Sequence, residues 1–268
     1  MVAGMSSRFG GRIKQFAKVT EDKTLIEYSL DQALKSGFSK IIFIVGNLTE
    51  EPFKKKFGDS YNGIPVFYAL QKFNPEVRDK PWGTTDAVCS IKEIIDCPFV
   101  ICNGDDIYGE NTFRIAFECL KNKNECSTIG YQLLEVLPET GTVNRGIFES
   151  DNGYATKITE TFNISKLNFK ELGLNENSLC SQNIFSMHPE IVKLLNAELI
   201  KFKEKNAKDR KIECLLPAEL SKLINQGDIS MRLHATPDKW IGITNPEDEE
   251  VVRNLIRNSI NSFKKKHQ

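Results

Sequence analysis

The sequence lacks an excess of charge of either sign. Lys and Arg together number 36, and so do Asp and Glu, so the formal net charge of the 268 residues is zero. Binding to nucleic acid or to an anionic membrane normally depends on clustered positive charge. The composition therefore favours neither partner, and we expect no nucleic acid and no membrane. The lysine run at 264–266 fits a solvated helix end, where cations suit the helix dipole.

Long apolar runs, paired cysteines and histidines are also scarce. No apolar run approaches the roughly 20 residues that span a bilayer, and no signal-peptide pattern precedes the first motif. The seven cysteines are scattered and form no C-x-x-C pair, which predicts reduced thiols in a cytoplasmic protein rather than a zinc or disulfide framework. With three histidines in the chain, chemistry that needs a histidine base has few candidates.

Strand and helix patterns alternate through the first half of the chain. The runs 40–46, 64–70 and 97–106 are rich in β-branched and aromatic residues, whereas 24–37 and 83–95 have helical spacing. This alternation predicts an α/β fold with a mostly parallel sheet and helices on both faces.

The pattern changes after about Leu137, where short strands and then helices follow. No repeat or low-complexity linker separates the two parts. We therefore expect one domain over 1–268, with a first half at 1–137 and a smaller lobe with C-terminal helices at 138–268.

The chain opens with the glycine-rich, basic stretch AGMSSRFGG, followed by Lys14. Glycine lets backbone amides approach a phosphate closely, and Arg8 and Lys14 could neutralise its charge. The stretch matches neither G-x-x-x-x-G-K-[ST] nor G-x-G-x-x-G. Taken alone, it fits a solvated surface loop equally well.

Two further motifs follow predicted strands. PWGTTDAV opens a helix, and NGDDIYG ends a buried strand with Asp105 and Asp106. Adjacent carboxylates there are costly unless they are paired or bind a metal such as Mg²⁺, although N-G-D is also strong turn chemistry. Because ligands of open parallel sheets bind at the carboxyl ends of the strands, we expect the motifs to converge.

Together these motifs resemble those of the sugar-phosphate nucleotidyltransferases, such as N-acetylglucosamine-1-phosphate and glucose-1-phosphate uridylyltransferases. AGMSSRFGG is similar to their A-G-x-G-[ST]-R loop, PWGTTDAV to their P-x-G-T-A loop, and GDD to their G-D metal site. Gly146, Glu160 and Asn183 resemble single family residues at the sugar. The resemblance spans nearly the whole chain and implies a Rossmann-like, mostly parallel mixed sheet with helices on both faces and a smaller sugar-binding lobe.

The resemblance also implies roles for individual residues. Arg8, Lys14 and Asp105 would be catalytic, with Mg²⁺ on Asp105 and with Asp106 and Asn245 as further candidate ligands. The first half would bind the nucleotide and the smaller lobe the sugar. The implied contacts are Ala3, Gly4, Met5, Gln71, Gly83 and Thr84 for the nucleotide, and Gly146, Glu160 and Asn183 for the sugar.

Three departures from the family pattern bear on function. Ser6 replaces the second loop glycine, and Thr161 follows Glu160 where many relatives place a lysine that contacts the sugar phosphate. That contact then needs another source. Relatives also carry a full strand before the loop, of which Met1–Ala3 remain. Either native residues are missing from the start, or Met1–Ala3 suffice as a short strand.

The implied reaction joins a nucleoside triphosphate to a sugar 1-phosphate and releases pyrophosphate. Its nucleophile is a phosphate oxygen that is already ionised at neutral pH, so no general base is needed. UTP with an N-acetylhexosamine or hexose 1-phosphate is the first choice. A cytidylyltransferase for phosphocholine or a related alcohol phosphate is the nearest alternative, and a nucleotide-binding protein with weakened catalysis is another. The resemblance leaves a homo-oligomer open.

Overall fold

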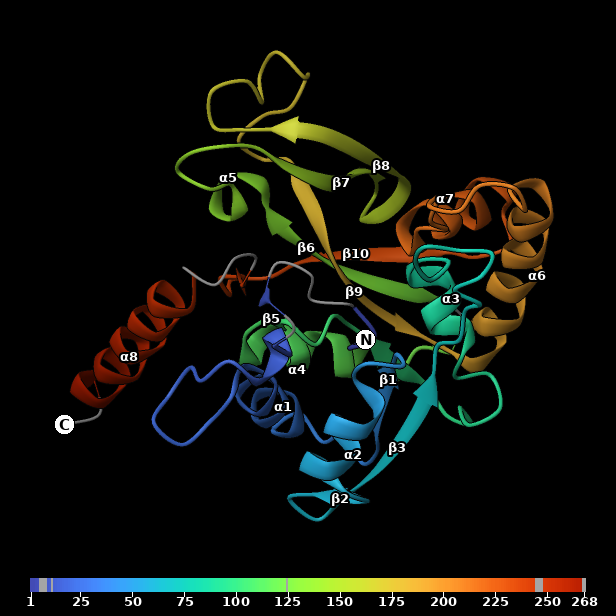
Figure 1. Cartoon of the computed structure of the whole chain (residues 1–268). Helices are drawn as coiled ribbons and strands as arrows, with labels where there is room; N and C mark the ends of the chain where they lie inside the picture. The colour runs from blue at the N-terminus through green and yellow to red at the C-terminus, as the bar shows by residue number, and fades with distance from the viewer. Residues whose placement is uncertain (5–8, 11, 124, 244–247, 267–268) are drawn as a thin grey trace.

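The computed structural model describes residues 1–4, 9–10, 12–123, 125–243 and 248–266, the last nine of these by their backbone only. Figure 1 shows a lower half that contains β1–β3 and an upper lobe formed around the β7–β8 hairpin. The helices are η2, a 3₁₀ helix (Lys14–Phe16), α1 (Leu25–Leu34), α2 (Glu50–Phe57), α3 (Thr84–Cys89), α4 (Glu110–Cys119), α5 (Leu133–Val136), α6 (Pro189–Lys205), α7 (Leu216–Gln226) and α8 (Asp248–Lys266). The strands are β1 (Ile41–Val45), β2 (Ser60–Tyr61), β3 (Ile64–Leu70), β4 (Phe99–Ile101), β5 (Asp106–Ile107), β6 (Cys126–Gln132), β7 (Val143–Asp151), β8 (Tyr154–Ile164), β9 (Leu179–Met187), β10 (Met231–Ala235) and β11 (Ile241–Gly242).

The strands form a mixed sheet system. β1 pairs in parallel with β3, and β2 pairs with β3 in the antiparallel direction. A larger sheet has the order β4-β9-β6-β10-β8-β7, in which β10 is parallel to β6 and β9 is antiparallel to both of its neighbours. The α/β class and the mixed sheet predicted from the sequence are confirmed.

The segment Met1–Ala3 joins the two sheets. The Val2 amide donates a hydrogen bond to the Ile44 carbonyl at 2.8 Å, and the Met1 nitrogen donates to the Cys102 carbonyl at 2.7 Å. The Gly104 amide donates to the Met1 carbonyl at 2.8 Å, and Val2 is only 1% exposed. The segment therefore pairs with β1 on one side and with the extension of β4 on the other.

Helices cover both faces of the larger sheet. On β9, the successive residues Ile184 and Phe185 are both fully buried, but they belong to different apolar clusters. The cluster that contains Ile184 includes Phe113 of α4, and the cluster that contains Phe185 includes Leu195 of α6 and Leu220 of α7. Because successive side chains of a strand point to opposite faces, the sheet is sandwiched between α4 and the α6–α7 pair.

Helix α7 is fixed to both halves of the molecule. The amide of Leu216 at its start donates to the Thr84 hydroxyl at 2.8 Å. One turn further on, the Ser221 hydroxyl accepts a hydrogen bond from the amide of Ile158 on β8 at 3.1 Å. Helix α7 therefore holds both the loop that precedes α3 and the strand β8.

Two predicted elements are shorter than the sequence indicates. The helix expected over 83–95 ends at Cys89, because the Ser90 hydroxyl donates to the Ala87 carbonyl at 2.6 Å and competes with the helical pattern. The strand expected over 97–106 divides into β4 and β5, since the chain turns at Asn103–Asp105. This turn carries the aspartates away from the sheet and brings β5 against β11.

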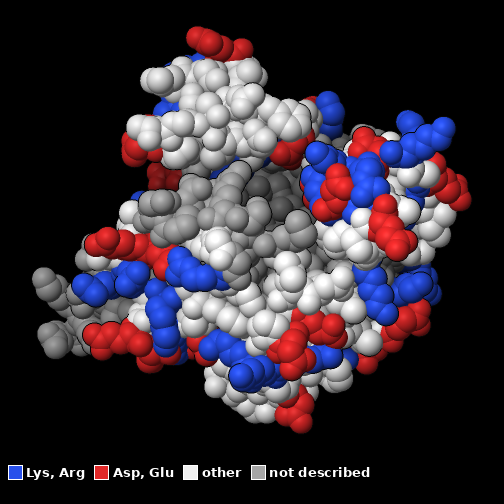
Figure 2. Space-filling model, viewed as in Figure 1, with Lys and Arg blue, Asp and Glu red and all other residues white. Residues whose placement is uncertain are grey.

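No described helix combines the length and the apolar character that crossing a bilayer requires. On the face shown in Figure 2, acidic and basic side chains are intermixed over the right-hand and lower parts of the surface. This distribution matches the zero net charge of the chain.

Candidate active site

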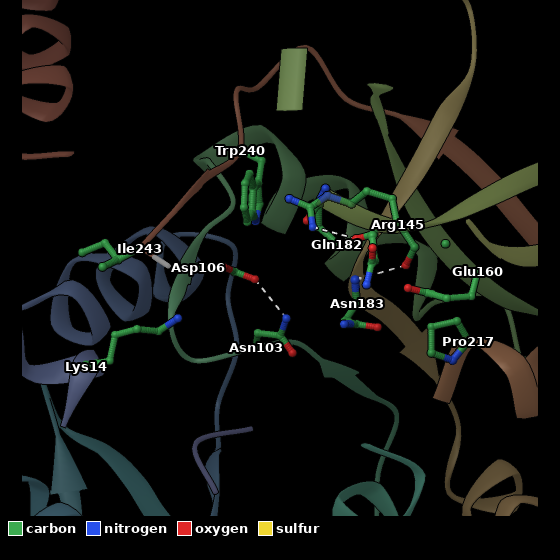
Figure 3. A pocket seen from close by; sticks show the side chains of 13 residues that line it. Lys14, Asn103, Asp106, Arg145, Glu160, Gln182, Asn183, Pro217, Trp240 and Ile243 are labelled. Atoms are coloured by element: carbon green, nitrogen blue, oxygen red, sulfur yellow. Dashed lines mark hydrogen bonds between the residues drawn. The ribbon is translucent and has the colours of Figure 1, made fainter. Parts of the chain in front are cut away.

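A cleft of about 200 Å³ lies where the upper lobe meets the strand ends of the lower half (Figure 3). Its lining comes from η2, from the loop after β4, from β7, β8 and β9, and from the segment around β11. The lining residues are Lys14, Asn103, Asp106, Asn144, Arg145, Gly146, Glu160, Ser181, Gln182, Asn183, Pro217, Trp240 and Ile243. The cleft therefore brings together residues from most of the length of the chain.

One end of the cleft is lined by Asp106, and Asp105 adjoins this end through its ion pair with Lys14, although it is not itself part of the lining. The Lys14 ammonium on η2 lies 2.6 Å from Oδ2 of Asp105. Asp106 is buried, and its carboxylate accepts hydrogen bonds from the Asn103 amide at 3.0 Å and from the Tyr108 hydroxyl at 3.3 Å. The β5–β11 pairing places Asp106 opposite Gly242 and holds this carboxylate beside the Trp240 ring. We name this region the carboxylate end.

The carboxylate end crowds two acidic groups into a buried region. Burial, followed by the neighbouring charge of Asp105, raises the pKa of Asp106 to about 7. The Lys14 ammonium pairs with Asp105, and the buried amino group of Met1 interacts electrostatically with both carboxyl groups. A cation bound here would relieve both causes of the pKa shift, because it favours the charged form of the carboxyl group.

Mg²⁺ fits the donor chemistry of this end. It prefers oxygen ligands and is often held by one or two carboxylates together with phosphate oxygens and water. Asp105 and Asp106 would hold it, and the described residues form no group of three or more metal-ligating side chains. Phosphate and water would then complete the coordination. Asn245, the further candidate ligand, lies outside the described residues.

The other end of the cleft holds the predicted sugar residues. Gly146 on β7 pairs directly with Glu160 on β8. A Cβ atom at position 146 would lie 3.2 Å from Cγ2 of Ile158 and 3.7 Å from Oε2 of Glu160, so glycine keeps the space beside this carboxylate open. Burial is the largest cause that raises the pKa of Glu160, and the positive charge of Arg145 opposes it.

Asn183 adds an unused hydrogen-bond acceptor. Its backbone is in the left-handed region, with φ of 57°, a conformation that asparagine adopts more readily than most residues. Its side-chain oxygen is buried and has no hydrogen-bond partner among the described residues. A ligand hydroxyl would satisfy this oxygen, because an unpaired buried acceptor is costly.

The predicted base-binding residues meet each other outside this cleft lining. The Gln71 side-chain amide donates to the Gly83 carbonyl and to Asp86, each at 2.9 Å. Gly83 has φ of 98°, and a Cβ atom there would lie 2.7 Å from the Cys214 carbonyl oxygen, so only glycine fits. Thr84 uses its hydroxyl to cap α7. The ligand roles of these residues stay predictions.

The opening loop is described only in part. Ala3 lies against Gly46, where a Cβ atom would come within 2.8 Å of the Ala3 carbonyl oxygen. Gly4 is exposed and has open space around it. Met5, Ser6 and Arg8 lie outside the described residues, so their predicted roles stay predictions. Lys14, at the end of the loop, does reach the cleft.

Sequence reasoning missed several lining residues, most notably Arg145 and Trp240. The Arg145 guanidinium lies 5.1 Å from the centre of the Trp240 ring. Arg145 immediately precedes Gly146 in NRGIF, and this proximity was the available signal. No local pattern marks Trp240, because it reaches the cleft through the pairing of β11 with β5.

Comparisons with known proteins identify the family and the fold of the chain. The family model described as nucleotidyl transferase matches residues 10–232. A UTP–glucose-1-phosphate uridylyltransferase of Haloferax volcanii is 26% identical over 91 residues, which cover 34% of this chain and 34% of that protein. The bifunctional protein GlmU of Bacillus subtilis is 25% identical over 187 residues, or 68% of this chain and 37% of that protein. The chain thus spans about a third of the length of the curated relatives it matches.

Solved structures share the fold at low sequence identity. A putative glucose-1-phosphate thymidylyltransferase from Bacillus anthracis superposes with a TM-score of 0.70 at 14% identity, covering 96% of this chain and 93% of that chain. The inositol-1-phosphate CTP transferase from T. maritima gives 0.67 at 14% identity, covering 94% and 92%. A UTP-bound UGPase from Acinetobacter baumannii gives 0.66 at 16% identity, covering 95% and 90%. With the family model matched over most of its length, this chain belongs to the nucleotidyl transferase family.

Proposed function

We propose that the protein is an Mg²⁺-dependent nucleotidyltransferase that makes a nucleotide sugar from a nucleoside triphosphate and a sugar 1-phosphate. The first-choice nucleotide is UTP, and the first-choice product is UDP-N-acetylglucosamine or UDP-glucose. We place the reaction in the cytoplasm, in keeping with seven cysteines that are all free. Pyrophosphate is the second product.

The observation that carries the proposal is the division of one cleft into two chemically different ends. The carboxylate end offers Lys14, Asp105 and Asp106, which suit a metal-bound polyphosphate. The opposite end offers Gly146, Glu160 and the free oxygen of Asn183, which suit sugar hydroxyls. A sugar 1-phosphate placed across the cleft would direct its phosphate toward the nucleotide.

The chemistry follows from this placement. An ionised oxygen of the sugar phosphate attacks the α-phosphorus of the nucleotide and forms a new P–O bond. The bond from the α-phosphorus to the bridging oxygen breaks, and pyrophosphate leaves with the electron pair. Lys14 neutralises charge on the polyphosphate, and Mg²⁺, when bound by Asp105 and Asp106, supplies further neutralisation. Glu160 and Asn183 orient the acceptor, which contributes through proximity.

UTP is supported by the names of relatives, which include a UTP–glucose-1-phosphate uridylyltransferase and a UTP-bound UGPase. The inositol-1-phosphate CTP transferase with the same fold keeps cytidylyl transfer to an alcohol phosphate as the second candidate. Phosphocholine is less favoured as the acceptor, because the Trp240 ring that could face a quaternary ammonium already stacks against Arg145.

The test is pyrophosphate release from each of the four common nucleoside triphosphates, combined with hexose 1-phosphates, N-acetylhexosamine 1-phosphates, inositol 1-phosphate and phosphocholine. We expect one pair to dominate and EDTA to abolish its turnover, with excess Mg²⁺ restoring it. Dominance of CTP with an alcohol phosphate would select the second candidate. Nucleotide binding without pyrophosphate release from any pair would contradict the proposal and indicate a binding protein with weakened catalysis.

A further inference from the structure

We propose that Arg145 binds the phosphate group of the acceptor and selects phosphorylated acceptors over their unphosphorylated counterparts. This inference rests on the function proposed above and assigns a residue to a contact that the sequence leaves open. By the resemblance described above, Thr161 stands in place of a lysine that would contact this phosphate. The β7–β8 register places Arg145 directly opposite Thr161. Residues paired in this way have Cβ atoms about 4.5–5.5 Å apart, so a cation could act from the facing strand.

Arg145 differs from the other basic residue described in the cleft lining in having no salt bridge. Among the described lining residues the basic side chains are Lys14 and Arg145. Lys14 already pairs with Asp105 at 2.6 Å, whereas Arg145 has no carboxylate within 4.0 Å in the part of the chain that the structure describes. Arg145 is thus a cation in a partly enclosed site without a salt-bridge partner, although Glu160 lies near enough for an electrostatic interaction, and a bound anion would supply a close partner.

The hydrogen-bonding capacity of Arg145 is also largely unused. One terminal nitrogen donates to the Asn144 carbonyl at 3.0 Å. The Nε atom is buried and has no hydrogen-bond partner among the described residues. A guanidinium group offers a planar fork of donors that matches two phosphate oxygens. A phosphate monoester would satisfy the unused donors and the missing charge together.

The position of the guanidinium suits this role. It lies against the Trp240 ring, toward the middle of the cleft, while Glu160 lies further toward the end that would hold the sugar (Figure 3). The stacked ring restricts the orientation of the guanidinium without using its donors. The acceptor phosphate must lie between the sugar hydroxyls and the metal-bound nucleotide, and the guanidinium occupies this intermediate position.

The test compares Arg145→Gln and Arg145→Lys with Lys157→Gln in the full-length protein. Lys157 on β8 pairs with Glu149 at 3.3 Å outside the cleft lining, so its substitution removes one positive charge from the same hairpin without touching the site. With the productive substrate pair, we expect Arg145→Gln to raise KM for the sugar 1-phosphate roughly 10- to 100-fold. KM for the nucleotide should change less than about twofold. Arg145→Lys should recover part of the loss, because it keeps the charge but not the fork.

Binding of the acceptor and of the corresponding free sugar separates phosphate recognition from a loss of structure. Wild-type protein should bind the phosphorylated form more tightly, and Arg145→Gln should bind both forms with nearly equal affinity. Equal loss for both forms, or an effect confined to KM for the nucleotide, would overturn the inference while the proposed function stands.

If wild-type protein turns over no substrate pair, the proposed function fails and inorganic phosphate becomes the probe. Thermal stabilisation of wild-type protein and Lys157→Gln by phosphate, with loss in Arg145→Gln, would still support an anion site at Arg145. Equal stabilisation of all variants would overturn it.

Discussion

The two ends of the cleft differ in the charges that they carry. At the carboxylate end, the carboxyl groups of Asp105 and Asp106 lie near the ammonium of Lys14 and the buried amino group of Met1. Toward the other end, the Arg145 guanidinium has no carboxylate within 4.0 Å among the described residues, although its positive charge opposes the rise in the pKa of Glu160. This difference would suit a ligand that brings a metal cation to the first end and a phosphate group to Arg145, as proposed above.

Removing a charge from the carboxylate end should have the largest effect on turnover. We expect Asp105→Asn to lower kcat/KM about 100-fold or more, because it removes a proposed metal ligand and the partner of Lys14. Pyrophosphate release with saturating acceptor measures the effect. Asp59→Asn, at an exposed position, is the control for the lost charge and should retain activity. Unchanged turnover in Asp105→Asn would remove Asp105 from the catalytic machinery.

Alanine substitutions at Gly104 and Gly146 should show how tightly the backbone is packed at each end of the cleft. At Gly104, a Cβ atom would lie 2.2 Å from Cγ1 of Val2, whose branched side chain cannot easily move aside. We expect Gly104→Ala to lower the free energy of unfolding by about 1–3 kcal/mol. Chemical denaturation measures this change.

Gly146→Ala is the matched variant at the opposite end. Its Cβ atom would meet Ile158 at 3.2 Å, so we expect little loss of stability but weaker acceptor binding, since it would narrow the space beside Glu160. Equal destabilisation by both substitutions would contradict the proposed difference in packing.

Glu160→Gln tests the sugar end without disturbing the metal site. If the carboxylate accepts hydrogen bonds from sugar hydroxyls, its replacement should raise KM for the acceptor about tenfold. KM for the nucleotide should stay constant, and steady-state kinetics with each substrate varied in turn separates the two. A larger rise in KM for the nucleotide than in KM for the acceptor would contradict the placement of Glu160 at the sugar end of the cleft.

The smallest expected effect is a pH-dependent difference in Tm between the wild-type protein and Glu160→Gln. Because burial raises the pKa of Glu160 in the folded protein, protonated Glu160 is favoured by folding. That contribution is present below the ordinary glutamate pKa of about 4.5 and is lost as pH rises through the folded pKa. Glu160→Gln should therefore have the higher Tm at pH 7–8, by about 1–2 °C, and a similar Tm near pH 4. A wild-type protein that is more stable than the variant at pH 8 would contradict the sign.

Much of this architecture could be predicted from local sequence, but the completed cleft could not. The alternation of apolar runs indicated the mixed α/β fold. The glycine-rich loop and the strand-end motif named Lys14 and Asp106, which both line the cleft. Arg145 could not be assigned because its environment depends on the register of β7 with β8, which includes irregular pairing near Val143. Trp240 depends on a two-residue strand pairing that leaves no periodic signal.

Thr84 shows the reverse limitation. The family motif suggested a ligand contact, yet its hydroxyl accepts the first amide of α7 in this structure. A single threonine can serve a loop or a helix start, and the sequence does not show which partner lies nearby.

Helix α7 therefore connects the two groups of predicted ligand residues. It is held at its start by the loop that carries Gly83 and Thr84, and one turn later by the strand that carries Glu160. If these residues hold the nucleotide and the acceptor as proposed, a displacement of this helix by a fraction of an ångström would change the alignment of both substrates. The distance between nucleophile and phosphorus would then depend on a helix from which Pro217 reaches the cleft.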